Sequence, residues 1–191
     1  FAFAKSITRA RREIPNILAN LDNELTAMAR ETIAELYDLF RDLDRRIAAF
    51  DKKIDAVFRS NDACQRIAKI KGVGPKTATA VVAAIGDGTE FKNGRHLAAW
   101  VGLVPRQFSS GDRKVLMGIS KRGNQHLRSL LVHGARSVVR TAQKKIDPSN
   151  QWVNELRQRR GFNRATVAVA NKNARIIWAV LRTGEPYRAA C

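Results

Sequence analysis

Residues 70–86, with the sequence IKGVGPKTATAVVAAIG, join two apolar segments through the turn Gly72-Val73-Gly74-Pro75. Glycine lets a backbone approach a ligand closely and adopt conformations closed to other residues. Proline suits the first position of a helix, because its missing N–H would have no partner there. The stretch therefore predicts a short helix over about 62–70, a tight turn, and a second helix rich in small residues.

The second of these helices is placed to receive an anion. Its open N–H groups and the positive end of its dipole would face a phosphate. The arrangement resembles the helix-hairpin-helix motif, which binds the DNA backbone without reading sequence. The candidate phosphate contacts are Lys71, Gly72, Gly74 and Lys76. In the alternative interpretation this is a plain helical corner whose glycines serve packing alone.

A heptad-like apolar seam precedes this stretch and predicts one long helix over residues 16–58. Its steps mostly alternate three and four residues, as in a coiled coil or a long bundle helix. No Gly or Pro interrupts the segment after Pro15, which suits a helix start. At ~1.5 Å per residue the helix would be about 60 Å long. We expect it to pair with another copy of the chain or with a helix that precedes Phe1.

Downstream, residues 103–123 (LVPRQFSSGDRKVLMGISKRG) form a basic segment that carries two adjacent serines, Ser109 and Ser110. Its prolines and glycines exclude a long helix, and we expect an irregular hairpin that turns at Gly111-Asp112. A hydroxyl among cations suits phosphate-ester chemistry, although the same residues would also suit a polar turn beside DNA. The cations of this segment are Arg106, Arg113, Lys114, Lys121 and Arg122.

The remaining chain predicts helices over about 124–143, 151–160 and 164–182, with Asp147-Pro148-Ser149 as a linker. The densest basic run is Arg157, Arg159, Arg160 and Arg164. These arginines would either grip a phosphate backbone or form a solvated surface. His126 and His133 are seven residues apart, His96 stands alone, and no third ligand has a suitable spacing, so no metal site is predicted.

The composition favours a helical protein with a polyanionic partner. Aromatic residues make up only 7% of the 191, and 35 Lys and Arg stand against 17 Asp and Glu, a net charge of +18. Such an excess most often indicates nucleic acid. Two cysteines form no disulfide framework or zinc spacing, and no apolar run reaches the ~18–20 residues of a membrane span. We expect a cytoplasmic protein with no membrane contact.

Four blocks in fixed order carry a family resemblance: IKGVGPKTATAVVAAIGD, FKNGRHLAAWVGLVPRQFSSG, ISKRGNQHLRSLLVHGARSV and AVANKNARIIWAVL. Over residues 62–187 they resemble the transposase domain of the IS one-ten insertion sequences and of Piv/MooV DNA invertases. The preceding long helix is similar to that family's coiled-coil linker. Several spaced blocks are far more specific than any single motif.

The resemblance implies a serine nucleophile that attacks a DNA phosphodiester and forms a phosphoserine link. By motif this is Ser110, with Ser109 as the alternative, and Asp112 replaces the second glycine of the family pattern. It also implies a guide RNA, and an N-terminal RuvC-like domain whose carboxylates hold Mg²⁺. That domain is missing here, and the chain begins without Met, so we expect a fragment that is inactive alone and binds no cofactor.

These observations predict a mainly α protein, with a long coiled-coil helix and a compact helical domain that contains the helix-hairpin-helix motif and an irregular catalytic loop. The expected domains are a linker helix over 1–58, a transposase core over 59–146, and basic helices over 147–191. The expected function is the catalytic-serine half of a transposase or site-specific recombinase. The alternative is a non-catalytic helix-hairpin-helix module that binds DNA and dimerises through its coiled coil.

Overall fold

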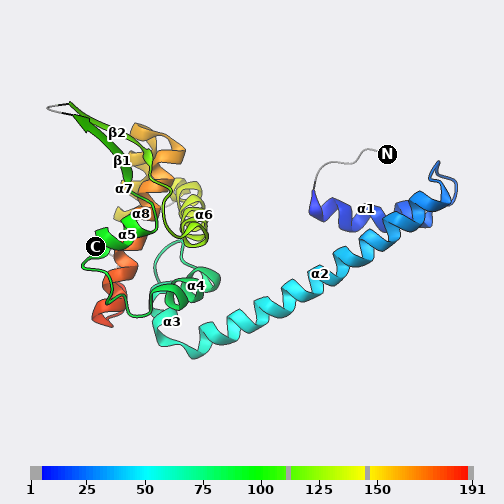
Figure 1. Cartoon of the computed structure of the whole chain (residues 1–191), viewed down its shortest axis with the longest axis horizontal. Coiled ribbons are helices and arrows are strands. Elements are labelled where there is room, and N and C mark those ends of the chain that lie inside the picture. The colour runs from blue at the N-terminus through cyan, green and yellow to red at the C-terminus, as the bar shows by residue number, and fades with distance from the viewer. Residues whose placement is uncertain (1–5, 111–112, 145–146, 189–191) are drawn as a thin grey trace. The chain divides into compact units, whose positions relative to one another are not determined.

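A computed structural model describes residues 6–110, 113–144 and 147–188, and it confirms the mainly helical fold. The chain divides into two compact units, residues 1–53 and 54–191 (Figure 1). In chain order the elements are α1 (Ile7–Ala19), α2 (Ala27–Ser60), α3 (Asp62–Ala68), α4 (Pro75–Ile85), α5 (Gly94–Trp100), β1 (Pro105–Ser110), β2 (Arg113–Ile119), α6 (Gln125–Thr141), the 3₁₀ turn η1 (Ala142–Lys144), α7 (Pro148–Arg160) and α8 (Phe162–Thr183).

The predicted long helix exists as α2, with 34 residues, but its predicted start is wrong. Pro15 lies inside α1, and the chain leaves the helix between residues 20 and 26. Asn20 accepts a hydrogen bond from the backbone N–H of Asp22 through its side chain, and Asn23 does the same for Leu25. Such local bonds offer the backbone an alternative to the helical ladder, and the apolar period does not reveal them.

Helix α1 folds back onto α2 through polar contacts. The Arg11 guanidinium donates two hydrogen bonds to Asp44, at 2.8 and 2.7 Å, and this contact lowers the pKa of the Asp44 carboxyl. Arg30 donates to the carbonyl oxygens of Leu18 (2.6 Å) and Asn20 (3.1 Å), and so caps the end of α1. No described residue of either helix is buried.

Helix α8 is the central element of the second unit, since it packs against α3, α5, α6 and α7. Its buried face includes Ile177, Ala170 and Ala174. Three of its polar side chains also donate hydrogen bonds to backbone carbonyl oxygens of the loops between the other helices and strands. Asn173 donates to the carbonyl of Lys71 (2.9 Å), Asn171 to that of Leu103 (3.2 Å), and Trp178 to those of Gly88 (3.2 Å) and Phe91 (3.1 Å).

The serine segment forms a two-stranded antiparallel hairpin. Pro105 pairs with Ile119 at its base and Ser110 with Arg113 at its far end, and a bulge lies between Pro105 and Gln107. The expected hairpin is thus present, with regular pairing beyond the bulge. The expected turn at Gly111-Asp112 lies outside the described residues.

The expected linker at residues 147–149 is wrong, because Asp147 is the N-cap of α7. Its side chain accepts a hydrogen bond from the backbone N–H of Asn150 (3.3 Å), and Pro148 occupies the first helical position. Both residue types favour a helix start as much as a loop. The hydrogen bond decides between the two.

Candidate nucleic-acid interface

The two glycines of the 72–75 turn have different surroundings, one packed against α6 and the other open. Gly72 has φ +87° and packs against α6, where a Cβ would lie 2.8 Å from the carbonyl oxygen of Gly134 and from Val138. Gly74 is the N-cap of α4 and has open space where a Cβ would be. As the N-cap residue, Gly74 has no side chain that could accept a hydrogen bond from the N–H groups of the first turn of α4. The packing interpretation therefore describes Gly72, whereas Gly74 leaves the helix start accessible to an anion.

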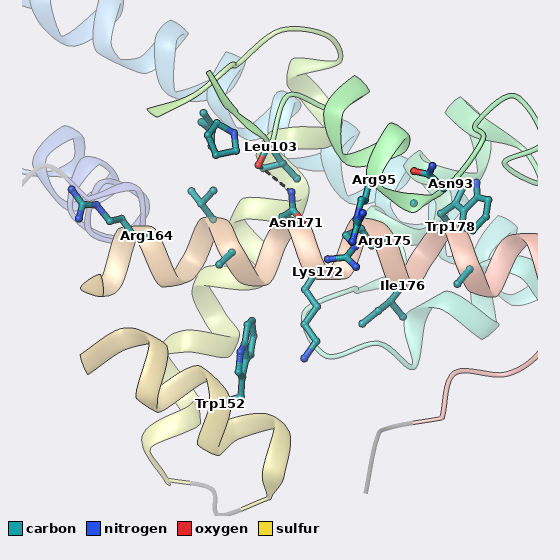
Figure 2. A pocket seen from close by; sticks show the side chains of 16 residues that line it. Asn93, Arg95, Leu103, Trp152, Arg164, Asn171, Lys172, Arg175, Ile176 and Trp178 are labelled. Carbon is teal, nitrogen blue, oxygen red and sulfur yellow. Dashed lines mark hydrogen bonds between the residues drawn. The ribbon is translucent and has the colours of Figure 1, made fainter. Parts of the chain in front are cut away.

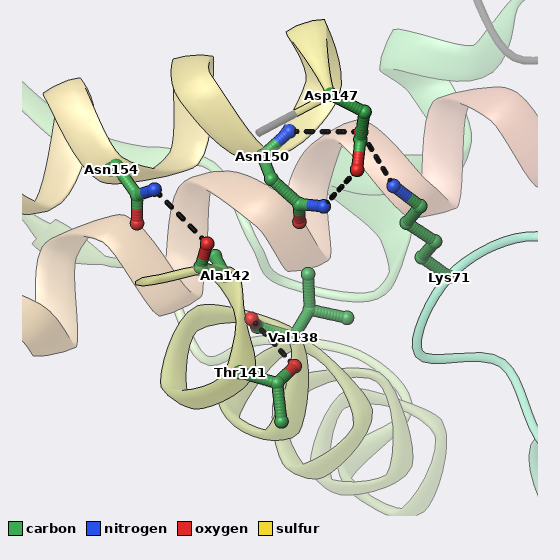
Figure 3. Close-up of polar contacts among 7 residues, drawn as sticks. All are labelled: Lys71, Val138, Thr141, Ala142, Asp147, Asn150 and Asn154. Atoms are coloured by element: carbon green, nitrogen blue, oxygen red, sulfur yellow. Dashed lines mark hydrogen bonds and ion pairs between the residues drawn. The ribbon is translucent and has the colours of Figure 1, made fainter. Parts of the chain in front are cut away.

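Lys71 is held by the fold on both sides (Figure 3). Its ammonium pairs with Asp147 at 2.7 Å, and its carbonyl accepts the hydrogen bond from Asn173. Asp147 also accepts from the side-chain amide of Asn150. The hydrogen bond from the Lys71 ammonium is the main reason that the pKa of the Asp147 carboxyl is lowered. Lys71 therefore joins the 72–75 turn to the start of α7. Lys76 is exposed in the first turn of α4.

The base of the hairpin is bound closely to the end of α5. The N–H of Ser120 donates to Val104 (2.8 Å), and that of Lys121, at φ +55°, donates to Gly102 (3.2 Å). A Cβ on Gly102 would overlap the carbonyl oxygen of Arg122. The exposed side chains of Lys121 and Arg122 therefore stand on a backbone that the core holds in place.

Arg128 is a positioning residue that the sequence did not single out. From α6 its guanidinium donates to the carbonyl oxygens of Val101 (2.9 Å) and Arg122 (3.1 Å). One side chain therefore ties the end of α5 to the segment that follows β2. A basic residue early in a helix carries no sign of this contact, because its partners lie in other elements.

The hairpin separates the cations that the sequence placed around the serines. Arg106 lies at the bulge near the base, at the end where β2 leads into Lys121 and Arg122. Ser109 and Ser110 pair with Lys114 and Arg113 at the far end. At ~3.3 Å per residue, the backbones of Arg106 and Ser110 lie about 13 Å apart along the strand. Only Arg113 and Lys114 are brought next to the serines by strand pairing.

The basic run spans the joint between α7 and α8. Arg157 and Arg136, which belongs to α6, stand over the ring of Phe162 at 5.5 and 6.0 Å. Such cation–aromatic contacts hold a guanidinium in place while leaving it charged. Arg159, Arg160 and Arg164 are exposed. Arg136 joins this cluster from a different helix, so it was missed in the sequence.

An open groove of about 1070 Å³ lies between α5, the base of the hairpin, α7 and α8 (Figure 2). Its lining includes four cations, Arg95, Arg164, Lys172 and Arg175. The Lys172 ammonium stands 4.1 Å from the centre of the Trp152 ring. Of these residues only Arg164 was a candidate from the sequence. The spacing 164–172–175, which places three cations on one side of α8, could have found Lys172 and Arg175, whereas Arg95 belongs to α5 and gives no such signal.

Within the described residues no three His, Cys, Asp or Glu side chains gather as a metal site would require. The described helices likewise include none with the length and apolar character needed to cross a bilayer. The residues of this chain that the structure describes thus supply cations and hydrogen-bond donors to the interface.

Comparison with known families identifies the class. Residues 64–149, which begin in α3 and extend to the first turn of α7, match the Transposase IS116/IS110/IS902 family. The chain belongs to this family of transposases.

Individual relatives extend the likeness over nearly the whole chain. The transposase for insertion sequence element IS1111A of Coxiella burnetii is 46% identical over 185 residues, which cover 97% of this chain and 51% of that protein. A probable family 20 transposase of Pseudomonas aeruginosa is 45% identical, covering 92% and 52%. The pilin gene-inverting protein of Moraxella bovis is 30% identical, covering 66% and 39%. The chain spans about half the length of the first two relatives.

Proposed function

We propose that this chain is the serine-bearing half of a transposase or site-specific DNA recombinase, and that Ser110 is its nucleophile, with Ser109 as the alternative. The observation that carries the proposal is the position of the two serines in the hairpin. They end a strand whose base is joined to the core through Ser120, Lys121 and Arg128. A nucleophile at such a place can reach a partner surface without disturbing the fold.

The chemistry is transesterification at phosphorus. The Ser110 oxygen forms a bond to the phosphorus of a DNA phosphodiester, and the bond from phosphorus to one sugar oxygen breaks. The serine proton leaves and the freed sugar oxygen gains one, so a phosphoserine link and a strand end result. Attack by a hydroxyl of another strand reverses the step and releases the serine. Arg113 and Lys114, paired with the serines, are proposed to offset charge on the phosphoryl oxygens.

A serine hydroxyl needs a base or a metal ion to become a good nucleophile. The described residues do not form a metal site. On the family resemblance we propose that the carboxylates and Mg²⁺ belong to a RuvC-like domain outside this chain, so that the active site is composite.

The DNA and protein partners are proposed from the exposed surfaces, and the guide RNA is proposed from the family resemblance. DNA phosphates are proposed to meet the open start of α4 at Gly74 and Lys76, and the cations around the hairpin base and the α7–α8 joint. A guide RNA is the second proposed partner, within the nucleoid of a bacterial cytoplasm. A second copy of the chain is proposed to cover the exposed apolar stripe of α2, which comprises Leu36, Leu39, Leu43, Ile47 and Phe50.

The test is recombination by a longer protein that contains this chain and the RuvC-like domain. Ser110→Ala is expected to abolish strand exchange and the covalent protein–DNA adduct seen on a denaturing gel, while DNA binding persists. Ser109→Ala is the matched control and is expected to retain both activities. If the two effects are exchanged, Ser109 is the nucleophile. If both variants recombine normally, the chain is a non-catalytic DNA-binding module.

A further inference from the structure

We propose that the groove between α5, the hairpin base, α7 and α8 binds an unpaired strand of nucleic acid, with its phosphates on Arg95, Arg164 and Arg175 and a base against Trp152. The inference concerns binding alone, so it holds whether or not Ser110 is the nucleophile. The groove is a further binding site for the proposed nucleic-acid partners, and Arg164 is the one sequence candidate among its cations.

The charge of the groove is the first argument. Four of its lining residues are cations, and none of those that the structure describes is acidic. Among the described residues, no carboxylate lies within ion-pair distance of Arg95, Arg164 or Arg175. Like charges gathered along an open groove without carboxylate partners repel one another and attract an anion. The groove therefore fits a ligand that carries several negative charges.

The arrangement of these cations is fixed by close helix packing. A Cβ on Gly94 would lie 2.8 Å from the carbonyl oxygen of Arg175, so only glycine lets the start of α5 rest on α8 at this point. This contact places the adjacent Arg95 next to Arg175, and Figure 2 shows both side chains in the groove. Arg164 lies eleven residues earlier on α8, about 16 Å away at ~1.5 Å per residue. The positive charge thus extends along a line.

The apolar part of the lining is the second argument, and it distinguishes a single strand from a duplex. Trp152 borders the groove together with Leu103, Pro105, Ile119 and Ile176. A duplex presents phosphates and sugars outward and keeps its base faces stacked inside, so it could not use these surfaces. An unpaired base has an exposed π-face that stacks on an aromatic ring, with little regard to sequence.

The size of the groove agrees with such a ligand. Pockets for single small molecules occupy about 300–1,000 Å³, and this one has about 1070 Å³ and is open to solvent. The Lys172 ammonium already stands over Trp152 at 4.1 Å. It is therefore placed to pair with a phosphate once a base takes up the ring.

The test is binding of labelled oligonucleotides to the purified chain, measured by fluorescence anisotropy over a range of salt concentrations. The probes are an oligodeoxyuridylate and an oligouridylate of about 12 nucleotides, which differ only in the 2′-hydroxyl, and a duplex of the same length. Arg95→Gln with Arg175→Gln is expected to reduce the salt slope for the single strands by about 1.4, since each lost contact accounts for about 0.7. The slope for the duplex is expected to stay unchanged.

The matched control is Arg140→Gln with Lys144→Gln, which removes the same charge from exposed positions outside the groove lining. It is expected to leave the single-strand slope as it was. An equal reduction in the control would show diffuse attraction and overturn the proposal. So would an equal reduction for the duplex, or single-strand binding that the groove variant leaves unaltered.

Variants at Trp152 test the stacking of a base independently of the charge. Trp152→Ala is expected to weaken single-strand binding about tenfold without changing the salt slope, because stacking releases no counterions. Trp152→Phe keeps an aromatic face and is expected to bind within about threefold of the parent chain. Circular dichroism checks that both variants fold. Equal binding by Trp152→Ala and the parent chain would contradict stacking. A preference between the deoxyuridine and uridine probes, which differ only in the 2′-hydroxyl, would identify the strand as DNA or RNA.

Discussion

Replacing Gly134 by alanine is expected to push α6 away from the 72–75 turn and to destabilise the second unit. Alanine is normally the better residue inside a helix, by about 1 kcal/mol. Here, however, a Cβ at position 134 would overlap the carbonyl oxygen of Gly72. The substitution therefore sets a local gain in helix propensity against a steric conflict between two backbone segments.

The magnitude follows from how little either segment can yield. The turn is tied to α8 by Asn173 and to α7 by the pair of Lys71 and Asp147, and α6 is anchored by its buried Leu131 and Val139. Overpacking costs about 1–3 kcal/mol, and a rigid backbone on both sides argues for the upper end. After the gain of about 1 kcal/mol in propensity, a net loss of about 2 kcal/mol is expected.

Thermal unfolding followed by circular dichroism measures this loss. At about 4 °C per kcal/mol for a unit of this size, Tm is expected to fall by about 8 °C. Ser137→Ala, an exposed substitution in the same helix, is the control and is expected to raise Tm slightly through propensity alone. A rise in Tm for Gly134→Ala, similar to that of the control, would refute the close approach of α6 to the turn.

Three further predictions concern single contacts. The pKa of the Asp147 carboxyl is lowered in the fold, first by its hydrogen bond with Lys71. The carboxylate therefore stabilises the fold above its ordinary pKa, and this stabilisation is lost as the pH falls through the lower folded value. Asp147→Asn is expected to weaken the acid-side dependence on pH of the free energy of unfolding, measured with urea. Arg128→Ala is expected to cost about 1–2 kcal/mol and to speed hydrogen exchange around Arg122; unchanged exchange there would contradict its positioning role. Leu43→Lys, at a side chain 49% exposed, is expected to lower the mass measured by light scattering, and a parent chain that is already monomeric would refute pairing through α2.

Much of the candidate interface could be predicted from the sequence, because local rules govern it. The pair Gly74-Pro75 favours a helix start after an apolar segment, and in the structure the side chains of Asn93 and Asn124 cap α5 and α6. The hairpin followed from Pro105 and the glycines that exclude a helix. The error at Pro15 had the same origin, since proline favours a helix start, whereas in the structure Pro15 lies in the interior of α1 (Ile7–Ala19).

The groove and the positioning residues could not be predicted in this way. Arg95 and Arg175 are 80 positions apart, and only the contact of Gly94 with α8 brings them together. Arg128 and Asn173 look like ordinary polar residues of amphipathic helices until their carbonyl partners are known. No periodic pattern records a contact between a side chain and the backbone of a distant loop.

The sequence by itself determined the helical class, the family, the strong positive charge and the presence of a serine pair in a basic hairpin. Each of these follows from composition or from residues that are neighbours in the chain. Tertiary structure alone decided that Gly72 serves packing while Gly74 leaves α4 open, and that Arg106 stands about 13 Å from Ser110 along the strand. It also decided that α8 holds three loops by side-chain amide and indole donors. The physical reason is that close approach and hydrogen bonding depend on distances in space, which a linear pattern does not contain.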